Sequence, residues 1–261
     1  AAYITGCFFV AAISAWYLLK KQHIEIAKIG LSFAMWAALI IVPLQVSVGD
    51  TVGLEVHQYQ PLKTAAIEGV WDTQSGAPLV LIGYPDNKLE KNLYTISIPY
   101  GASLLNTHSL NGTLVGLKSV PPQDRPVVAA TFFGFRIMVG IGVFYLALAI
   151  IALFLRPRGR LYTSRWFQWL CVLGAPLGMV ATIAGWITAE CGRQPWVVYN
   201  LMRTADGVSA VPASHVALTL GSIIVVYILI FIFFVYYLFE FIRKGPEAKV
   251  VPAFTYMGDK P

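Results

Sequence analysis

The stretch GWITAECGRQPW, residues 185–196, closes a long apolar run and determines how the chain is interpreted. The run covers 167–189 and ends in the carboxylate Glu190, with Arg193 three residues further on. An unpaired charge beside hydrocarbon is costly, so Glu190 needs a partner. It is either a structural partner of Arg193 or a working group. Trp186 lies four residues before Glu190 and shares its helix face, either beside a working site or in an interfacial aromatic belt.

The composition is that of an integral membrane protein. Apolar residues make up 57% of the 261 residues, charged residues 12%, and the mean hydropathy is +0.67. Soluble domains carry about 25% charged residues. The net charge of +6 does not indicate nucleic-acid binding, because membrane proteins collect Lys and Arg in cytoplasmic loops. The three cysteines are scattered, which favours neither a zinc site nor a disulfide framework.

Five apolar runs are long enough for most or all of a bilayer crossing, which takes about 20 helical residues. They are 3–19, 29–48, 127–155, 167–189 and 216–241. Helices are expected, because backbone groups in hydrocarbon must be satisfied internally. The predicted fold is an all-α integral membrane protein. The first apolar run starts at the first residue, which is not Met, so we expect the C-terminal part of a longer chain with a truncated first span.

The basic residues predict the orientation. Those between spans one and two, between three and four, and after span five fall on one side: Lys20, Lys21, Lys28, Arg156, Arg158, Arg160, Arg165, Arg243, Lys244, Lys249 and Lys260. The positive-inside rule makes that side cytoplasmic. The predicted organisation is therefore two spans in 1–48, an outward loop in 49–126, three spans in 127–244 and a cytoplasmic tail in 245–261. Segment 190–215 also faces outward.

The loop 49–126 is long for a passive connector, and such loops are usually functional or disordered. Its aromatic and apolar residues argue against disorder. Residues 60–71 predict a short helix with Pro near its start, and 94–98 predict a strand. Lys63 and Glu68 are five residues apart, which predicts no ion pair on a helix face. Glu68 and His57 could each take or relay a proton, the alternative being a solvated loop face.

The third span carries Arg136 about ten residues in, or roughly 15 Å along the helix. An arginine at this depth indicates a function and an anionic partner: a haem propionate, a lipid headgroup or a carboxylate. The alternative is an arginine that reaches out to the interface. Met138, two residues on, is either a packing residue or an axial haem ligand.

Three blocks resemble subunit I of cytochrome bd-type quinol oxidases. They are Gly49-Asp50 with Gln60-x-x-Lys63-x-Ala65-Ala66-Ile67-Glu68-x-x-Trp71, then Phe135-Arg136-Ile137-Met138, and finally residues 185–196. With the order of spans and loops, the resemblance covers nearly the whole chain. It implies about five helices of a larger, nine-span bundle with an outward quinol-binding loop. The missing spans would carry the remaining haem ligands and the proton path.

The resemblance also implies roles for individual residues. Met138 matches the axial ligand of a low-spin haem b, and Arg136 the arginine beside it. Glu190 matches the carboxylate ligand of a high-spin haem in a di-haem site, and Trp186 a tryptophan near the haems. The di-haem site would hold a high-spin haem b with haem d or a second high-spin haem b. The site residues implied in the loop and beyond it are Gln60, Lys63, Glu68 and Arg193.

The implied activity is a quinol:O2 oxidoreductase. Quinol is oxidised at the outer loop, electrons pass through the low-spin haem b to the di-haem site, and O2 is reduced to water. Protons are taken from inside and released outside, which builds a gradient without pumping. The expected location is the bacterial inner membrane, among lipid. The expected partners are oxidase subunit II and a small single-span subunit, with no nucleic acid. The short loop is similar to that of cyanide-insensitive oxidases.

Two other functions stay open on the residues alone. A transporter or channel could use Arg136 and Glu190 to line a pathway, and would show inverted repeats or broken half-helices, neither of which the sequence indicates. A non-catalytic scaffold subunit would lack haem. The chain alone is expected to be inactive, because it lacks the histidine of the low-spin haem.

Overall fold

The computed structural model describes residues 1–246, and most of the predicted tail 245–261 lies outside them. The longer helices are α1 (Ala2–Lys20), α2 (Ile24–Tyr59), α5 (Val128–Leu155), α6 (Arg165–Gly174), α7 (Leu177–Cys191) and α8 (Ala213–Lys244). Five helical segments are long and apolar enough to cross a membrane. They are Ala2–Lys20, Ile24–Tyr59, Pro122–Leu155, Arg165–Cys191 and Ala213–Lys244. The prediction of five helical spans is confirmed.

The chain divides into two compact units, Ala1–Ser209 and Ala210–Pro261. The described part of the second unit is essentially α8, an apolar helix of 32 residues. It ends in Arg243 and Lys244, and Lys244 Nζ lies 2.7 Å from the carboxylate of Glu240 one turn earlier. A cation at a helix C-terminus is favourable beside the backbone dipole. The first unit holds all the predicted site residues.

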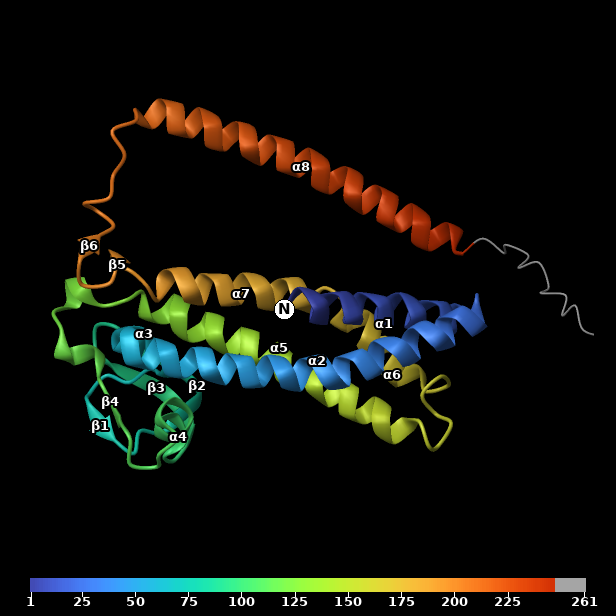
Figure 1. Ribbon diagram of the computed structural model, residues 1–261, viewed down its shortest axis with the longest axis horizontal. Coiled ribbons are helices and arrows are strands. Elements are labelled where there is room, and N and C mark those ends of the chain that lie inside the picture. Colours follow the sequence, from blue (N-terminus) through green and yellow to red (C-terminus); the bar gives the residue numbers. More distant parts are fainter. Residues whose placement is uncertain (247–261) are drawn as a thin grey trace, which may run out of the picture. The chain divides into compact units, whose positions relative to one another are not determined.

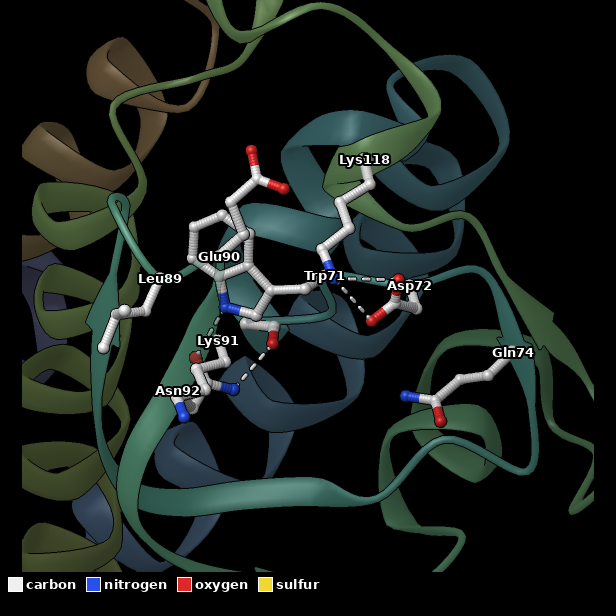
Figure 2. A pocket seen from close by; sticks show the side chains of 9 residues that line it. Trp71, Asp72, Gln74, Leu89, Glu90, Lys91, Asn92 and Lys118 are labelled. Carbon is white, nitrogen blue, oxygen red and sulfur yellow. Dashed lines mark hydrogen bonds and ion pairs between the residues drawn. The ribbon is translucent and has the colours of Figure 1, made fainter.

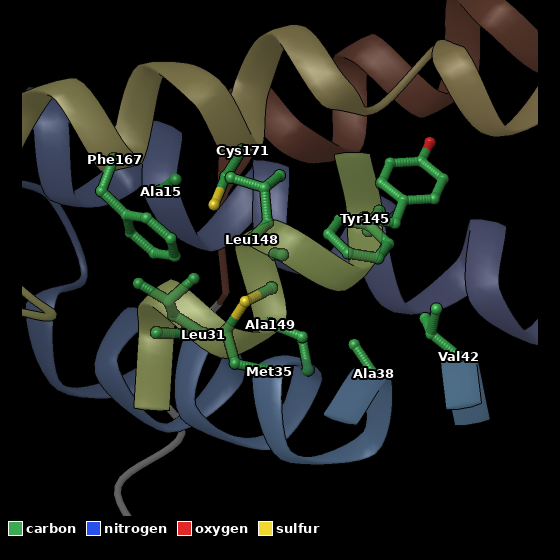
Figure 3. Close-up of a cluster of buried hydrophobic side chains, with 14 of the residues drawn as sticks. Ala15, Leu31, Met35, Ala38, Val42, Tyr145, Leu148, Ala149, Phe167 and Cys171 are labelled. Atoms are coloured by element: carbon green, nitrogen blue, oxygen red, sulfur yellow. The ribbon is translucent and has the colours of Figure 1, made fainter. Parts of the chain in front are cut away.

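An apolar cluster joins α1, α2, α5 and α6 in the first unit (Figure 3). Phe8 of α1 stacks on Tyr145 of α5, with ring centroids 3.8 Å apart and planes 12° apart. Leu31 and Met35 of α2 lie beneath Phe167 of α6, and all three side chains are fully buried. In a membrane such contacts stabilise through close van der Waals packing rather than through release of water.

Helices α5 and α7 pack closely because small residues meet at their contact. A Cβ added to Gly134 of α5 would lie 2.6 Å from Oγ1 of Thr188 and 2.8 Å from the carbonyl oxygen of Ala184, both on α7. Only glycine allows the two backbones to come this near. The contact is of the small-residue kind that joins membrane helices.

Helix α2 continues well past the predicted end of its span at residue 48. Gly49-Asp50 suggested a stop, but the helix runs on to Tyr59 and ends just before Pro61. Its 36 residues correspond to about 54 Å, against a hydrocarbon core of about 30 Å. A glycine in a helix costs only about 1 kcal/mol, so it does not by itself end one. The segment predicted as a loop from residue 49 therefore begins with helix.

The fourth span is also broken, which the sequence analysis did not anticipate. Helix α6 ends at Gly174 and α7 starts at Leu177, with Pro176 between them. Proline removes a backbone donor and clashes with the preceding turn, which kinks or breaks a helix. The helix is interrupted at Pro176, whereas α2 continues through Pro43. The hydroxyl of Tyr145 donates to the carbonyl of Gly174 at 2.8 Å, which satisfies a carbonyl that the break frees.

The segment between α2 and α5 folds into small elements at one end of the first unit (Figure 1). These are α3 (Pro61–Glu68), β1 (Gln74–Ser75), β2 (Leu79–Asp86), β3 (Lys91–Ile98), α4 (Gly101–Thr107), β4 (Thr113–Leu114) and two short 3-10 helices, η1 (Leu117–Ser119) and η2 (Pro122–Asp124). Strand pairs β1–β4 and β2–β3 are both antiparallel. The predicted helix and strand are present as α3 and β3. A third antiparallel pair, β5 (Trp196–Val198) with β6 (Met202–Arg203), follows α7.

The opposite end of the first unit gathers the basic turns. Arg156, just after α5, donates to the hydroxyl of Ser32 at 2.7 Å and to its carbonyl at 2.8 Å, and lies over the ring of Trp36. This contact places the end of α5 beside the start of α2. Lys20 and Arg165 stand at ends of helices that lead to or from the same turns. The alternation of helix directions agrees with the expected sidedness, which stays a prediction.

We predict that Gly134→Ala destabilises the bundle by about 1–3 kcal/mol, because the new methyl group overpacks against the backbone of α7. Thermal unfolding of the purified membrane protein in detergent measures the loss. The matched control is Gly140→Ala in the same helix, where an added Cβ meets nothing within 4 Å. Equal unfolding temperatures for the two variants would show that the α5–α7 contact does not require glycine.

Candidate functional site

Helix α3 carries the predicted loop residues and is defined at both ends. Gln60 precedes Pro61, which fits the first turn of a helix because proline has no N–H to leave unpaired. Gly69 ends the helix in a left-handed conformation, φ +71°. A Cβ at Gly69 would lie 2.9 Å from the ring of Phe132 and 3.0 Å from the amide of Asn92. The end of α3 is thereby fixed against both α5 and β3.

Glu68, the last residue of α3, is 3% exposed. Its Oε1 accepts a hydrogen bond of 3.0 Å from Nδ2 of Asn106, on α4. Its Oε2 is buried and has no hydrogen-bond partner within residues 1–246. Burial raises the pKa of the Glu68 carboxyl, while the Asn106 bond and the positive charge of Arg136 act in the opposite direction. Glu68 is therefore a carboxyl that holds a proton more readily than a solvated one.

Lys63 lies between α3 and the end of α7. Its Nζ donates to the carbonyl of Ala189 at 3.2 Å, the residue before Glu190. Burial and the nearby Arg193 lower the pKa of the Lys63 amine, and Glu190 opposes the shift. No ion pair joins Lys63 to Glu68 among residues 1–246. Lys63 instead connects the loop to the predicted haem ligand.

Glu190 and Arg193 form an ion pair through Oε2 of the carboxylate. The structural interpretation of Glu190 is therefore realised in this structure, and the working role stays a prediction. Both side chains are about two-fifths exposed, at 43% and 42%. Trp186, one turn earlier on α7, is 66% exposed. An open carboxylate and an open indole on one helix face leave this side of α7 accessible to a further group.

Arg136 bonds to backbone carbonyls rather than to an anion. Its guanidinium donates to the carbonyl of Val80 from Nε at 3.0 Å and from Nη2 at 2.5 Å. Nη1 donates to Ile67 at 2.7 Å and to Phe132 at 3.0 Å. No ion pair of Arg136 with an acidic side chain is present among residues 1–246, although its charge acts on Glu68. In the described chain the guanidinium thus bonds to neutral oxygens of the loop and of α5 itself, and the anionic partner stays a prediction.

Met138 faces α7. Its Sδ would lie 2.7 Å from a Cβ at Gly185, so the glycine makes room for the thioether. Gly185 precedes Glu190 by five residues, or about 8 Å along the helix. Thioether and carboxylate are both iron ligands known from haem proteins or non-haem sites. Neither Met138 nor Glu190 is fully buried, so each could give one ligand to a haem. No group of three His, Cys, Asp or Glu that could hold a metal by itself occurs in the described residues.

Several buried polar atoms near α3 have no hydrogen-bond partner in residues 1–246. They are Nδ1 of His57, Oε1 of Gln60, Oγ1 of Thr64, Oε2 of Glu68 and Nε1 of Trp196. Gln60, Thr64 and Glu68 are spaced four residues apart, so they share one side of α3. Buried polar groups normally have partners, and a row without them indicates bound water or a ligand.

Sequence reasoning missed Asn106 and Thr64. Asn106 lies 38 residues after Glu68, and nothing in its neighbourhood marks it in the sequence. Thr64 could have been found from its place between Gln60 and Glu68 at helical spacing.

A separate cavity of about 320 Å³ opens on the loop beneath Trp71 (Figure 2). Trp71 Nε1 donates to Oδ1 of Asn92 at 3.0 Å, and Asn92 Nδ2 donates to the carbonyl of Gly69 at 2.7 Å. Lys118 pairs with Asp72 at its rim, 3.0 Å away. Among the site residues predicted from the sequence, none lines this cavity. The hydrogen bond from Asn92, which lines the cavity, holds Gly69, next to Glu68, in place.

The fold and site define a multi-span helical membrane protein with a structured loop against one end of the bundle. The family model described as cytochrome bd terminal oxidase subunit I matches residues 1–246. Cytochrome bd-II ubiquinol oxidase subunit 1 of Escherichia coli (strain K12) is 30% identical over 316 residues, covering 95% of this chain and 61% of the relative. Cytochrome bd ubiquinol oxidase subunit 1 of Bacillus subtilis (strain 168) is 35% identical over 265 residues, covering 94% and 55%.

The bd oxidase of Geobacillus thermodenitrificans has a similar structure, with a TM-score of 0.83 and 34% identity over 93% of this chain and 56% of the other. This chain belongs to the cytochrome bd terminal oxidase subunit I family. The predicted resemblance is therefore confirmed. The chain spans between 55% and 61% of the length of these relatives.

We predict that Arg136→Lys loosens the loop, because an ammonium cannot reproduce a fork bonded to three carbonyls. Hydrogen exchange of backbone amides in α3 and β2 should rise severalfold in the purified protein. The control is Arg158→Lys, since Arg158 donates only to Phe154 of its own turn. Unchanged exchange in both α3 and β2 would contradict the anchoring role of Arg136.

Proposed function

We propose that this chain is part of subunit I of a quinol oxidase and that quinol is oxidised at the outer end, beside Glu68. The proposal depends on one observation above all. Glu68 is almost fully buried in the loop, yet its Oε2 has no hydrogen-bond partner among the described residues. Lys63, on the same short helix, bonds to the residue before Glu190. A proton acceptor and a candidate iron ligand therefore share one end of the bundle, as quinol oxidation coupled to haem would require.

The chain's own residues would handle the protons of the quinol. Oxidation of a quinol releases two protons and two electrons. Glu68 Oε2 is placed to accept one proton from a hydroxyl, and its burial makes it a stronger base than an ordinary carboxylate. Gln60 offers an unpaired amide oxygen on the same side of α3, suited to a hydrogen bond from the second hydroxyl. Lys63 and Arg193 carry positive charges that lie beside Glu190.

Met138 would give its thioether to a low-spin haem b, and Glu190 its carboxylate to a high-spin haem. The second group of the di-haem site would be haem d or a second high-spin haem b. When bound, the haems would supply one-electron acceptors and the place where O2 becomes water. To bind iron, the Glu190 carboxylate would have to give up its ion pair with Arg193. Trp186 is open on the same face and would lie near the bound groups.

The remaining assignments follow from family and sidedness. The loop would face the periplasm and the basic turns the cytoplasm of a bacterial inner membrane. Protons released outside and taken up inside would build a gradient without pumping. Subunit II and a small single-span subunit are the proposed partners. Because this chain offers one ligand to each iron, we propose that it is inactive without the rest of the enzyme. A scaffold subunit would also lack a complete set of haem ligands. The haem content therefore distinguishes a scaffold subunit from an oxidase subunit.

We predict that, in the full-length parent chain with its partner subunit, Met138→Leu removes the low-spin b band and Glu190→Ala removes a high-spin band. Reduced-minus-oxidised spectra of membranes measure both. A wild type without haem bands would leave the scaffold or transporter interpretation. Intact bands in a variant would reject that ligand assignment alone.

We also predict that Gly185→Ala shifts the low-spin band while the haem content stays the same. The added methyl would displace the Met138 sulfur, which is flexible and moves at little cost. Gly142→Ala, where a Cβ meets nothing within 4 Å, is the matched control. Identical spectra for the two variants would place the Met138 sulfur away from iron.

A further inference from the structure

Asn106 is the residue on the loop that holds the Glu68 carboxyl. Its Nδ2 donates to Oε1 of Glu68 at 3.0 Å and to the carbonyl of Ala102 at 2.9 Å. Both hydrogens of the amide are therefore used, one to fix Asn106 on its own helix and one to fix Glu68. Neither contact requires a charge on Asn106, so the arrangement holds across pH.

The helix that carries Asn106 is itself fixed. The backbone N–H groups of Ala102 and Ser103 donate to the carbonyl of Ala77 at 3.1 and 3.3 Å. The Ser103 hydroxyl accepts from the N–H of Ala77 and donates to the carbonyl of Gly112, both at 2.7 Å. Ser103 is fully buried. A donor on so well anchored a helix gives the carboxyl of Glu68 one orientation.

The hydrogen bond from Asn106 leaves the two oxygens of Glu68 in different surroundings. Oε1 is occupied by Asn106, whereas Oε2 is buried and without a partner in the described chain. A donor that cannot accept a proton from the carboxyl stabilises its charged form over its neutral form. The bond therefore keeps Glu68 able to accept a proton in surroundings that favour the neutral acid.

We propose that Asn106 is a positioning residue for quinol oxidation, which directs Oε2 of Glu68 to the substrate hydroxyl and keeps the carboxylate ready to accept its proton. This inference rests on the proposed function. In the step, the quinol O–H bond breaks and an O–H bond forms at Oε2. The haems of the proposed oxidase would take up the electrons, one at a time. Asn106 itself touches neither the substrate nor the electrons.

The other charged groups around α3 do not substitute for Asn106. Arg136, from α5, acts on Glu68 through its charge alone and bonds to carbonyls. Lys63 points to α7. His108 of the turn after α4 pairs with Asp50 of α2 at 3.2 Å. The remaining groups on neighbouring elements are His57 and Glu55 of α2 and Lys118 of η1, and Lys118 pairs with Asp72.

The test is the pH profile of quinol oxidation by the full-length enzyme with its partner subunit. Asn106→Ala should shift the acidic limb to higher pH, because Glu68 loses a donor that favours its charged form. The rate at the acidic end should fall on the order of tenfold and recover at the alkaline end. Asn106→Asp keeps the shape and adds a negative charge, so its shift should be larger. Asn111→Ala, an exposed asparagine of the same loop, is the control.

Each outcome has a distinct meaning. A uniform loss of rate for Asn106→Ala, with an unmoved profile for both variants, would overturn the inference and assign Asn106 a structural role. Where Glu68→Gln leaves a residual rate, Asn106→Ala should no longer move the pH profile of that rate. If Glu68→Gln alone leaves quinol oxidation unchanged, the proposed function at this site fails instead. If Glu68→Gln abolishes oxidation and Asn106→Asp matches wild type at every pH, only the role of Asn106 is rejected.

Discussion

The close approach of α5 and α7 is the constraint on which the loop-bearing end of the bundle depends. Gly134 lets the backbones meet, and Thr188 and Ala184 fill the space that a side chain would need. From that contact, α5 presents Met138 to Gly185, and α7 presents the carbonyl of Ala189 to Lys63. A wider separation would leave the loop helix without its anchor on α7. Packing between small residues thus determines where the chemically active side chains meet.

The Glu68 carboxyl in the loop is subject to two opposed effects, burial and contact with polar or charged groups. Burial of Glu68 makes its charged form costly, while Asn106 and Arg136 lower that cost. Such opposed effects are common at functional sites, where a group must be able to exist in two protonation states. A fully paired carboxylate would be stable and inert, and a carboxyl without a partner would stay protonated. In Glu68, Oε1 is bonded to Asn106, and Oε2 has no hydrogen-bond partner among the described residues.

Local patterns predicted much of this structure. Hydropathy located five spans, Pro61 marked the start of α3, and alternation located β3. The failures have a physical cause. The second span was expected to end at residue 48, where the apolar run stops, but α2 continues to Tyr59. The break at Pro176 was overlooked because it lies inside one long apolar run, 167–189. The partners of Arg136 and the position of Asn106 arise from contacts 38 to 69 residues apart, which no local pattern reports.

The bonds between Arg136 and Val80 also bear on how a lipid-soluble molecule could reach the loop. The guanidinium of Arg136 also bonds to the carbonyl of Phe132, one turn nearer the start of α5, so β2 lies beside the first turns of that helix. The strand pair carries outward-facing aliphatic and aromatic side chains, among them Ile82, Tyr94 and Ile96. The loop thus has an exposed apolar side as well as a polar interior. Such a side favours contact with apolar molecules over contact with water.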